Sequence, residues 1–129
     1  MPSRNSAAEP HGALTVRTLA MPADTNPSGD IFGGWVMSQM DIAGGIAAYE
    51  RAMGRVVTVA VEAMTFIVPV KVGDVLCVYT AIEAIGTTSV TVDVEAWVRR
   101  QRISERIKVT EGRFVYVALD GNGKKRPVQ

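Results

Sequence analysis

The chain has 129 residues, with 14 Lys and Arg against 13 Asp and Glu, and a formal net charge of +1. This length fits one globular domain whose core needs no disulfides, and a nearly neutral chain is not built to bind nucleic acid. The single cysteine, Cys77, excludes an internal disulfide and suits a reducing compartment, so we expect a cytoplasmic protein.

The first thirty residues predict a tail, a strand and a loop. Residues 1–12 (MPSRNSAAEPHG) lack the apolar run of a secretory signal and are expected to be a disordered tail. Residues 13–20 alternate well enough for a strand. Residues 21–30 (MPADTNPSGD) have the composition of an irregular loop, and Asp30 stands where a helix N-cap is expected.

A long helix is predicted over residues 32–53, with Gly54 placed to end it. Apolar residues occupy all of its faces, which is typical of a buried helix, and Asp41 is the one charged side chain between residues 33 and 49. The helix would be about 30 Å long. It is too short, too rich in glycine and too polar at Asp41 to be read as a membrane span.

From Arg55 onward the apolar period changes to two, which predicts strands. They are expected at residues 57–67, 75–85, 88–99 and 107–119, followed by a basic tail at 121–129. Because the intervening turns are short, we expect consecutive strands to pair antiparallel. The predicted fold is therefore α+β: a single domain over residues 13–120, in which a curved antiparallel sheet wraps around one long helix. Such a sheet leaves an edge and a face open to a partner subunit.

Several kinds of catalytic site are excluded by the residues that the sequence lacks. His11 is the only histidine and lies in the tail, so Ser-His-Asp and Cys-His machinery is not expected. No His/Cys cluster has the spacing of metal ligands, so we expect no metal. Gly33 and Gly34 belong to neither a dinucleotide-binding nor a P-loop pattern. Cys77, in an apolar strand pattern, is interpreted as a small core residue.

Asp41, the glycine pair and Asn26 in the preceding loop remain as chemical candidates. Free N–H groups at Gly33 and Gly34 can stabilise an oxygen that gains negative charge at the helix start. A carboxylate can take a proton from water or attack as a nucleophile, and hydrolysis of an activated acyl group such as a thioester fits these parts. The structural alternatives are that Asp41 is hydrogen-bonded to a neighbouring strand and that Asn26 is a turn residue.

The spacing of these parts predicts a site shared between subunits. Gly34 and Asp41 are seven residues apart, which is roughly 10 Å along a helix. Oxyanion donors and a base must both lie about 3 Å from the reacting group. One helix can hardly do both, so we expect the oxyanion hole and Asp41 to come from different subunits.

The run TLAMPADTNPSGDIFGGWVMSQMDIAGGI, followed by GRVVTVAVEAMTFIVPVKVGDV, resembles the YciA-like acyl-CoA thioesterases of the hotdog-fold superfamily. The resemblance is strong over residues 18–75 and looser as far as residue 119. It implies a hotdog fold, hydrolysis of acyl-CoA to a free carboxylic acid and CoA, and homodimers that assemble into a hexamer, a trimer of dimers. Coenzyme A is then part of the substrate, and no separate cofactor is expected.

The resemblance also implies residue roles. The family's catalytic aspartate falls on Asp41, its loop asparagine on Asn26, and the glycines that polarise the thioester carbonyl on Gly33 and Gly34. The candidates for lining the acyl pocket, or alternatively for the core, are Trp35, Met64 and Phe66. The candidates for contacting the phosphates of CoA, or alternatively for a solvated surface, are Arg55, Arg99 and Arg100.

Two other functions are known classes of alternative on the same fold. Hydration or dehydration of an enoyl thioester normally relies on a histidine in the site, which this chain lacks outside its tail. A non-catalytic acyl-CoA-binding or sensor module would have no use for Asp41 and would usually carry a regulatory domain. Acyl-CoA hydrolysis is therefore the leading hypothesis.

Overall fold

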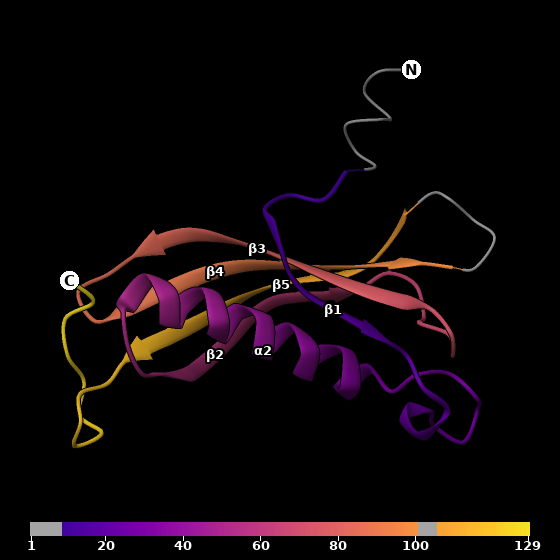
Figure 1. Ribbon diagram of the computed structural model, residues 1–129, viewed down its shortest axis with the longest axis horizontal. Coiled ribbons are helices and arrows are strands. Elements are labelled where there is room, and N and C mark those ends of the chain that lie inside the picture. The colour runs from indigo at the N-terminus through magenta and orange to yellow at the C-terminus, as the bar shows by residue number, and fades with distance from the viewer. Residues whose placement is uncertain (1–8, 101–105) are drawn as a thin grey trace.

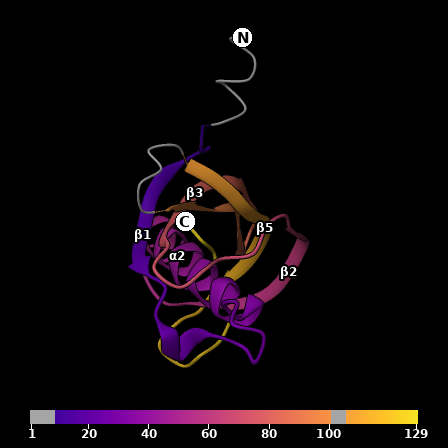
Figure 2. The same ribbon diagram turned by 90° about the vertical axis from the view of Figure 1, so that its right-hand side faces the viewer.

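The computed structural model describes residues 9–100 and 106–129, so residues 1–8 of the predicted N-terminal tail lie outside the described part. Its elements are β1 (Ala13–Leu19), the short 3-10 helix η1 (Pro22–Asp24), α2 (Gly33–Ala52), β2 (Val56–Phe66), β3 (Val75–Ile85), β4 (Ser89–Arg99) and β5 (Arg106–Ala118). Figure 1 shows α2 along one face of the sheet, and Figure 2 shows the sheet curving around it. The predicted helix and wrapped antiparallel sheet are confirmed.

The alternating pattern of β4 separates the two faces of the sheet. Its inward side chains are completely buried: Val90, Val92, Val94, Ala96 and Val98. Asp93 and Glu95, at the intervening positions, are only half-buried. On the inner face, Val36, Met40 and Ala43 of α2 join the same core. The period of two in the sequence therefore determines which face of the sheet receives the helix.

The strand order corrects one prediction. The sheet runs β1-β3-β4-β5-β2, so β2 pairs with β5 and does not form a hairpin with β3. The eight residues 67–74 between these strands are longer than a hairpin turn, and Pro69 among them has no N–H for a ladder. The N–H groups of Ile67 and Val68 both point to the Val109 carbonyl of β5, at 2.7 and 3.4 Å. β3 has β4 on one side and β1 on the other, so β2 cannot pair with it. Residues 67–74 therefore cross from β2, at one edge of the sheet, to β3 near the other.

The helix is buried on one face only, which corrects the expectation of burial all round. Ile42, Ile46 and Tyr49 are 51%, 40% and 56% exposed. They border one cavity together with Val56 and Thr58 of the edge strand β2. A single sheet covers one side of a helix, so the chain alone leaves an exposed apolar strip on α2, formed by Ile42, Ile46 and Tyr49. Among the described residues, no helix has the length and apolarity needed to cross a bilayer.

Both ends of α2 differ in detail from the prediction. The N-cap residue is Phe32, without a side-chain cap, and Asp30 instead pairs with Lys71 at 2.5 Å. At the other end, Met53 takes the left-handed conformation, with a φ of 56°. The Gly54 N–H then donates to the Tyr49 carbonyl at 3.2 Å, so Gly54 follows the C-cap as expected.

Residues 121–129, predicted as a basic tail, are part of the domain. The Arg126 guanidinium donates to the Ala52 carbonyl at 2.8 Å and to the Leu119 carbonyl at 3.0 Å. It thus places a positive charge at the C-terminus of α2, where the helix dipole favours one. The Val128 side chain is buried, and its N–H donates to the Thr87 carbonyl at 2.9 Å.

Candidate active site

Asp41 is half-buried on α2, facing the two strands at the β2 edge of the sheet. Its Oδ1 accepts a hydrogen bond from the Thr58 hydroxyl of β2 at 2.7 Å. The Tyr116 hydroxyl of β5 lies 2.9 Å from the same Oδ1 and 3.0 Å from the Asp41 main-chain oxygen. Within the described part of the chain, Oδ2 accepts no hydrogen bond. The carboxylate therefore has one bonded oxygen and one free oxygen.

Two cavities meet at Asp41 and Thr58. The larger, of about 580 Å³, also involves Ile42, Gly45, Ile46, Tyr49, Glu50, Arg55, Val56 and Tyr116. The smaller, of about 210 Å³, also involves Gly34, Met37, Ser38, Val61 and Phe114. Both cavities are mostly apolar, and the Asp41 carboxylate stands at their junction. A reacting group in either one would meet this side chain.

The helix start offers unpaired amide groups beside open space. Among the described residues, the N–H groups of Gly33 and Gly34 have no hydrogen-bond partner, and the N-cap residue Phe32 provides no side-chain cap. Gly34 borders the smaller Asp41 cavity, and a Cβ added there would meet nothing within 4 Å. Packing within the chain therefore does not require glycine at this position. A close approach by a ligand or a second chain is the remaining physical reason for glycine there.

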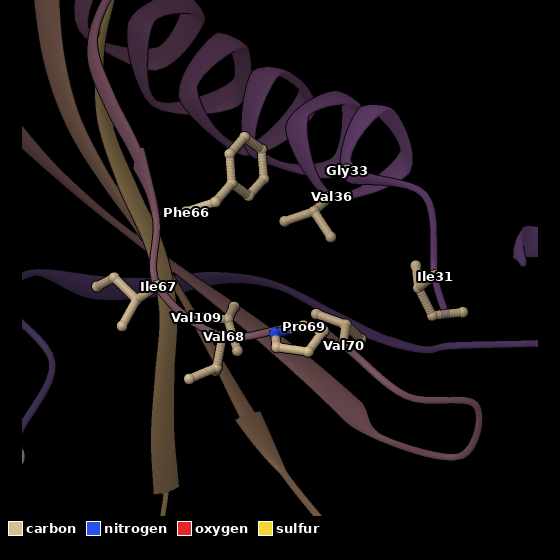
Figure 3. A pocket seen from close by; sticks show the side chains of 9 residues that line it. All are labelled: Ile31, Gly33, Val36, Phe66, Ile67, Val68, Pro69, Val70 and Val109. Carbon is tan, nitrogen blue, oxygen red and sulfur yellow. The ribbon is translucent and has the colours of Figure 1, made fainter. Parts of the chain in front are cut away.

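Gly33 borders a third cavity, of about 260 Å³, on the other side of the helix start (Figure 3). All of the residues that line it are apolar or glycine: Ile31, Gly33, Val36, Phe66, Ile67, Val68, Pro69, Val70 and Val109. The Phe66 ring would be 3.6 Å from a Cβ at Gly33. The segment 67–70, which crosses the sheet, forms much of its wall. A space of this kind suits a hydrocarbon chain.

Asn26 has the turn role that the structural alternative described. Its Oδ1 accepts hydrogen bonds from the Ser28 N–H at 2.9 Å and the Asp30 N–H at 3.1 Å. The loop returns to the helix start, since the Phe32 N–H donates to the Asp24 carbonyl at 3.0 Å. These bonds use the amide oxygen of Asn26, whereas its Nδ2 has no acceptor among the described residues. The turn and a role in binding are therefore compatible.

The three candidate arginines lie in different surroundings. Arg55 is exposed and borders the larger Asp41 cavity. Arg99 is exposed at the end of β4. The Arg100 guanidinium donates to both carboxylate oxygens of buried Asp74, at 3.1 and 3.2 Å, and to the Pro69 carbonyl at 2.8 Å. It thereby fixes the crossing segment, and only Arg55 adjoins Asp41.

Replacing Arg100 with methionine should therefore destabilise the fold. Buried Asp74 would keep its bond from the Lys71 N–H but lose its cationic partner. We expect a loss of about 1–3 kcal/mol in the free energy of unfolding, measured by urea denaturation. Exposed Arg99→Met is the matched control and should change this free energy little. A raised KM for acyl-CoA at unchanged stability would instead place Arg100 in the substrate site.

Trp35 and Met64 are half-buried and pack against the core. The Met64 Sδ accepts a hydrogen bond from the Thr110 hydroxyl at 3.5 Å. Of the three predicted pocket side chains, only Phe66 borders one of the cavities described above.

Thr58, Tyr116 and Gly44 were missed as functional candidates from the sequence. Thr58 and Tyr116 occur in ordinary alternating strand patterns, VTVAV and RFVYV. Gly44 is one of four glycines in the predicted helix, and nothing in the local sequence distinguishes it from Gly45. What joins them to Asp41 is the packing of β2 and β5 against the helix, for which the local sequence has no signal.

Solved structures share this architecture. A hexameric thioesterase from Yersinia pestis aligns with a TM-score of 0.90 at 54% identity, covering 94% of this chain and 99% of that one. A hexameric hotdog-fold thioesterase of Campylobacter jejuni aligns with a TM-score of 0.86 at 40% identity, covering 92% and 91%. The fold and the site thus define a hotdog-fold thioesterase.

Sequence comparisons narrow the class. Residues 28–105 match the family model of the thioesterase superfamily. The acyl-CoA thioester hydrolase YciA of Salmonella typhimurium is 58% identical over 122 residues, 92% of each chain. That of Escherichia coli is 59% identical over 120 residues, 91% of each chain. The chain belongs to the thioesterase superfamily, among the YciA-like enzymes that hydrolyse acyl-CoA thioesters.

Proposed function

We propose that Asp41 performs this hydrolysis and that Gly33 and Gly34 supply the N–H groups that stabilise the oxyanion. The observation on which the proposal depends is the free Oδ2 of Asp41 at the junction of two cavities. The reaction consumes one water and one acyl-CoA and releases a carboxylic acid and the CoA thiol. Water is the co-substrate and CoA is part of the substrate, so no separate cofactor is needed.

Oδ2 can act in two ways. As a base, it takes a proton from a water whose oxygen attacks the thioester carbon; the C–S bond then breaks, and the proton passes to the departing thiolate. As a nucleophile, it attacks that carbon itself and displaces the thiolate, and water then hydrolyses the mixed anhydride. A single turnover in ¹⁸O-labelled water tests the nucleophilic route: label in the Asp41 carboxylate, with an unlabelled product, identifies an anhydride whose Asp41 carbonyl is attacked by water. Label in the product alone fits both routes, because water attack on the acyl carbon of an anhydride gives the same result, and trapping of the anhydride then decides.

The site is proposed to combine two subunits. Gly34 and Asp41 lie on one helix face with Met37 and Ser38 between them, so the seven-residue separation remains roughly 10 Å. One chain cannot bring both within about 3 Å of one carbonyl group. The exposed apolar strip on α2 adjoins the larger Asp41 cavity and suits a second copy of the chain. We place Gly33, Gly34 and Asn26 of that copy opposite Asp41.

Relatives support the assembly and the residue choice. The Yersinia and Campylobacter enzymes are hexameric, and a trimer of such dimers is the assembly proposed here. An acyl-CoA hydrolase from Staphylococcus aureus, 28% identical, was solved as two variants in which an aspartate and an asparagine 15 residues before it were each changed to alanine. Asp41 and Asn26 have the same separation.

The substrate parts can be placed on the cavities. The apolar cavity beside Gly33 would take the acyl chain, with Phe66 in its wall. Arg55, at the larger cavity, would be the arginine available to a CoA phosphate. Trp35 and Met64 would support this site from the core.

Filling the acyl cavity should change chain-length preference. Val68→Phe adds a ring to its wall, and kcat/KM for a dodecanoyl thioester should fall by about 10-fold or more, while that for acetyl-CoA stays within about 2-fold. The same change at Val72, which is exposed in the following turn, is the control and should alter neither. Equal losses for both thioesters in Val68→Phe would contradict the assignment.

A free-thiol release assay over acyl-CoAs of varied length is the direct test of the proposed function. Turnover that disappears in Asp41→Asn supports it. The non-catalytic acyl-CoA-binding module predicts binding without thiol release, and that outcome would overturn the proposal.

A further inference from the structure

We infer that Tyr116 is a positioning residue that holds Oδ1 of Asp41 and so selects Oδ2 as the reacting oxygen. The inference rests on the proposed role of Asp41. Tyr116 lies on β5, 75 residues from Asp41 in sequence, and is 1% exposed. Its hydroxyl is bonded to the helix through the Asp41 side chain and main chain. It therefore fixes the carboxylate relative to its own helix turn.

The shared acceptor is the reason for the selection. The hydroxyl groups of Thr58 and Tyr116 lie 2.7 and 2.9 Å from Oδ1. The two oxygens of a carboxylate are chemically equivalent, so what matters is that two donors hold one of them on the strands and keep the plane of the group fixed. The other oxygen, here Oδ2, stays free of hydrogen bonds from the described residues, in a side chain that borders both cavities. Losing the Tyr116 bond would leave Thr58 alone, and rotation about the Cβ–Cγ bond would become easier.

Gly44 allows Tyr116 to reach this position. A Cβ added at Gly44 would lie 3.1 Å from two ring carbons of Tyr116 and closer still to its hydroxyl oxygen. Tyr116 is 1% exposed, although it borders the larger cavity, and its ring stacks on Phe114 with ring centroids 6.4 Å apart. Glycine at this helix position is thus required by the approach of the phenol. Gly44 and Tyr116 act as one unit.

The phenol remains a donor under all working conditions. Burial raises the pKa of Tyr116 well above its ordinary range, and the Asp41 charge and the hydrogen bond to Asp41 raise it further. The hydroxyl therefore keeps its proton and cannot act as a base. A donor of this kind stabilises the ionised carboxylate.

Tyr116→Phe removes the hydroxyl and keeps the ring. We expect kcat to fall by about 10- to 100-fold with KM nearly unchanged, because the cavities remain intact. Half-buried Tyr79→Phe on β3 is the matched control and should leave both kcat and KM in place.

Gly44→Ala tests the same inference without removing the hydroxyl. The added methyl group should displace the phenol, so kcat should fall as in Tyr116→Phe and the melting temperature should drop. Combining Gly44→Ala with Tyr116→Phe removes the Tyr116 hydroxyl oxygen, which is the atom nearest to the added methyl group. The double variant should therefore recover part of the lost melting temperature, and its kcat should be no lower than that of either single variant.

The outcomes separate the two proposals. A lower melting temperature for Tyr116→Phe with unchanged kcat would make Tyr116 a purely structural residue and overturn the inference. If Asp41→Asn is inactive in the same assay, the proposed function still stands. If Asp41→Asn is active, the proposed function fails, whatever Tyr116→Phe does.

Discussion

Asp41→Asn is expected to lower kcat by at least about 10²- to 10⁴-fold, the usual effect of losing a general base, and a nucleophile should cost no less. The substitution removes the ionisable oxygen Oδ2 and nearly preserves the side-chain volume. An asparagine oxygen can still accept the hydrogen bonds from Thr58 and Tyr116, so the melting temperature should hold. Binding should also survive, because the cavities and the helix-start amides are unchanged. The measurements are kcat, acyl-CoA binding and the melting temperature on one preparation.

The matched control is Asp93→Asn. Asp93 is a carboxylate of β4 on the sheet face opposite the helix, with an ion pair to Arg113 at 3.8 Å. Its replacement should leave kcat in place. If Asp41→Asn instead had near-normal kcat in a less stable protein, Asp41 would be a structural residue bonded to two strands, and the chain would lack its proposed catalyst.

Mixing subunits should restore activity that neither parent has. Asn26→Ala and Asp41→Ala homo-oligomers are each expected to be nearly inactive. In a mixed dimer, one of the two sites combines an intact Asp41 with an intact Asn26 from the other chain. Random co-assembly of equal amounts, through unfolding and refolding together, should then recover roughly a quarter of wild-type turnover. Thiol release measured before and after co-assembly gives the result.

A second mixture tests the same sharing through a loss of activity, measured against wild type that has been refolded alone. The double variant Asn26→Ala with Asp41→Ala, co-assembled with an equal amount of wild type, disables both sites of every mixed dimer if sites are shared. Turnover should fall to about a quarter, whereas sites within single chains would retain about half. No recovery in the first mixture together with half activity in the second would place Asn26 and Asp41 in one chain.

Asp41, Gly33, Gly34 and Asn26 could be singled out from the sequence, because their signals are local. Asp41 is conspicuous as a lone charge among apolar residues, and the glycines stand at a predicted helix start. Proposing thioester hydrolysis from them needed only the chemistry of a carboxylate and free amides. The positions of the helix and strands were equally readable, since the switch in apolar period from helical to alternating occurs within a few residues of Gly54.

Contacts between residues far apart in the sequence could not be predicted in this way. That β2 pairs with β5 depends on which sheet edge is free after β1 has joined β3, and adjacency in the chain suggested the wrong neighbour. The sequence pattern suggested that Arg100 is exposed to solvent, but its guanidinium donates to buried Asp74, which lies 26 residues earlier.

The sequence alone therefore determined the elements, the helix carboxylate and the chemistry available to it, because each depends on residues within a few positions of one another. Only the tertiary structure decided the surroundings of that carboxylate. Thr58, Gly44 and Tyr116 become partners of Asp41 only when two strands and a helix pack together, and the resulting hydrogen bonds leave Oδ2 free. Packing also decided which face of α2 is buried, because the single sheet of this chain can cover only one side of the helix.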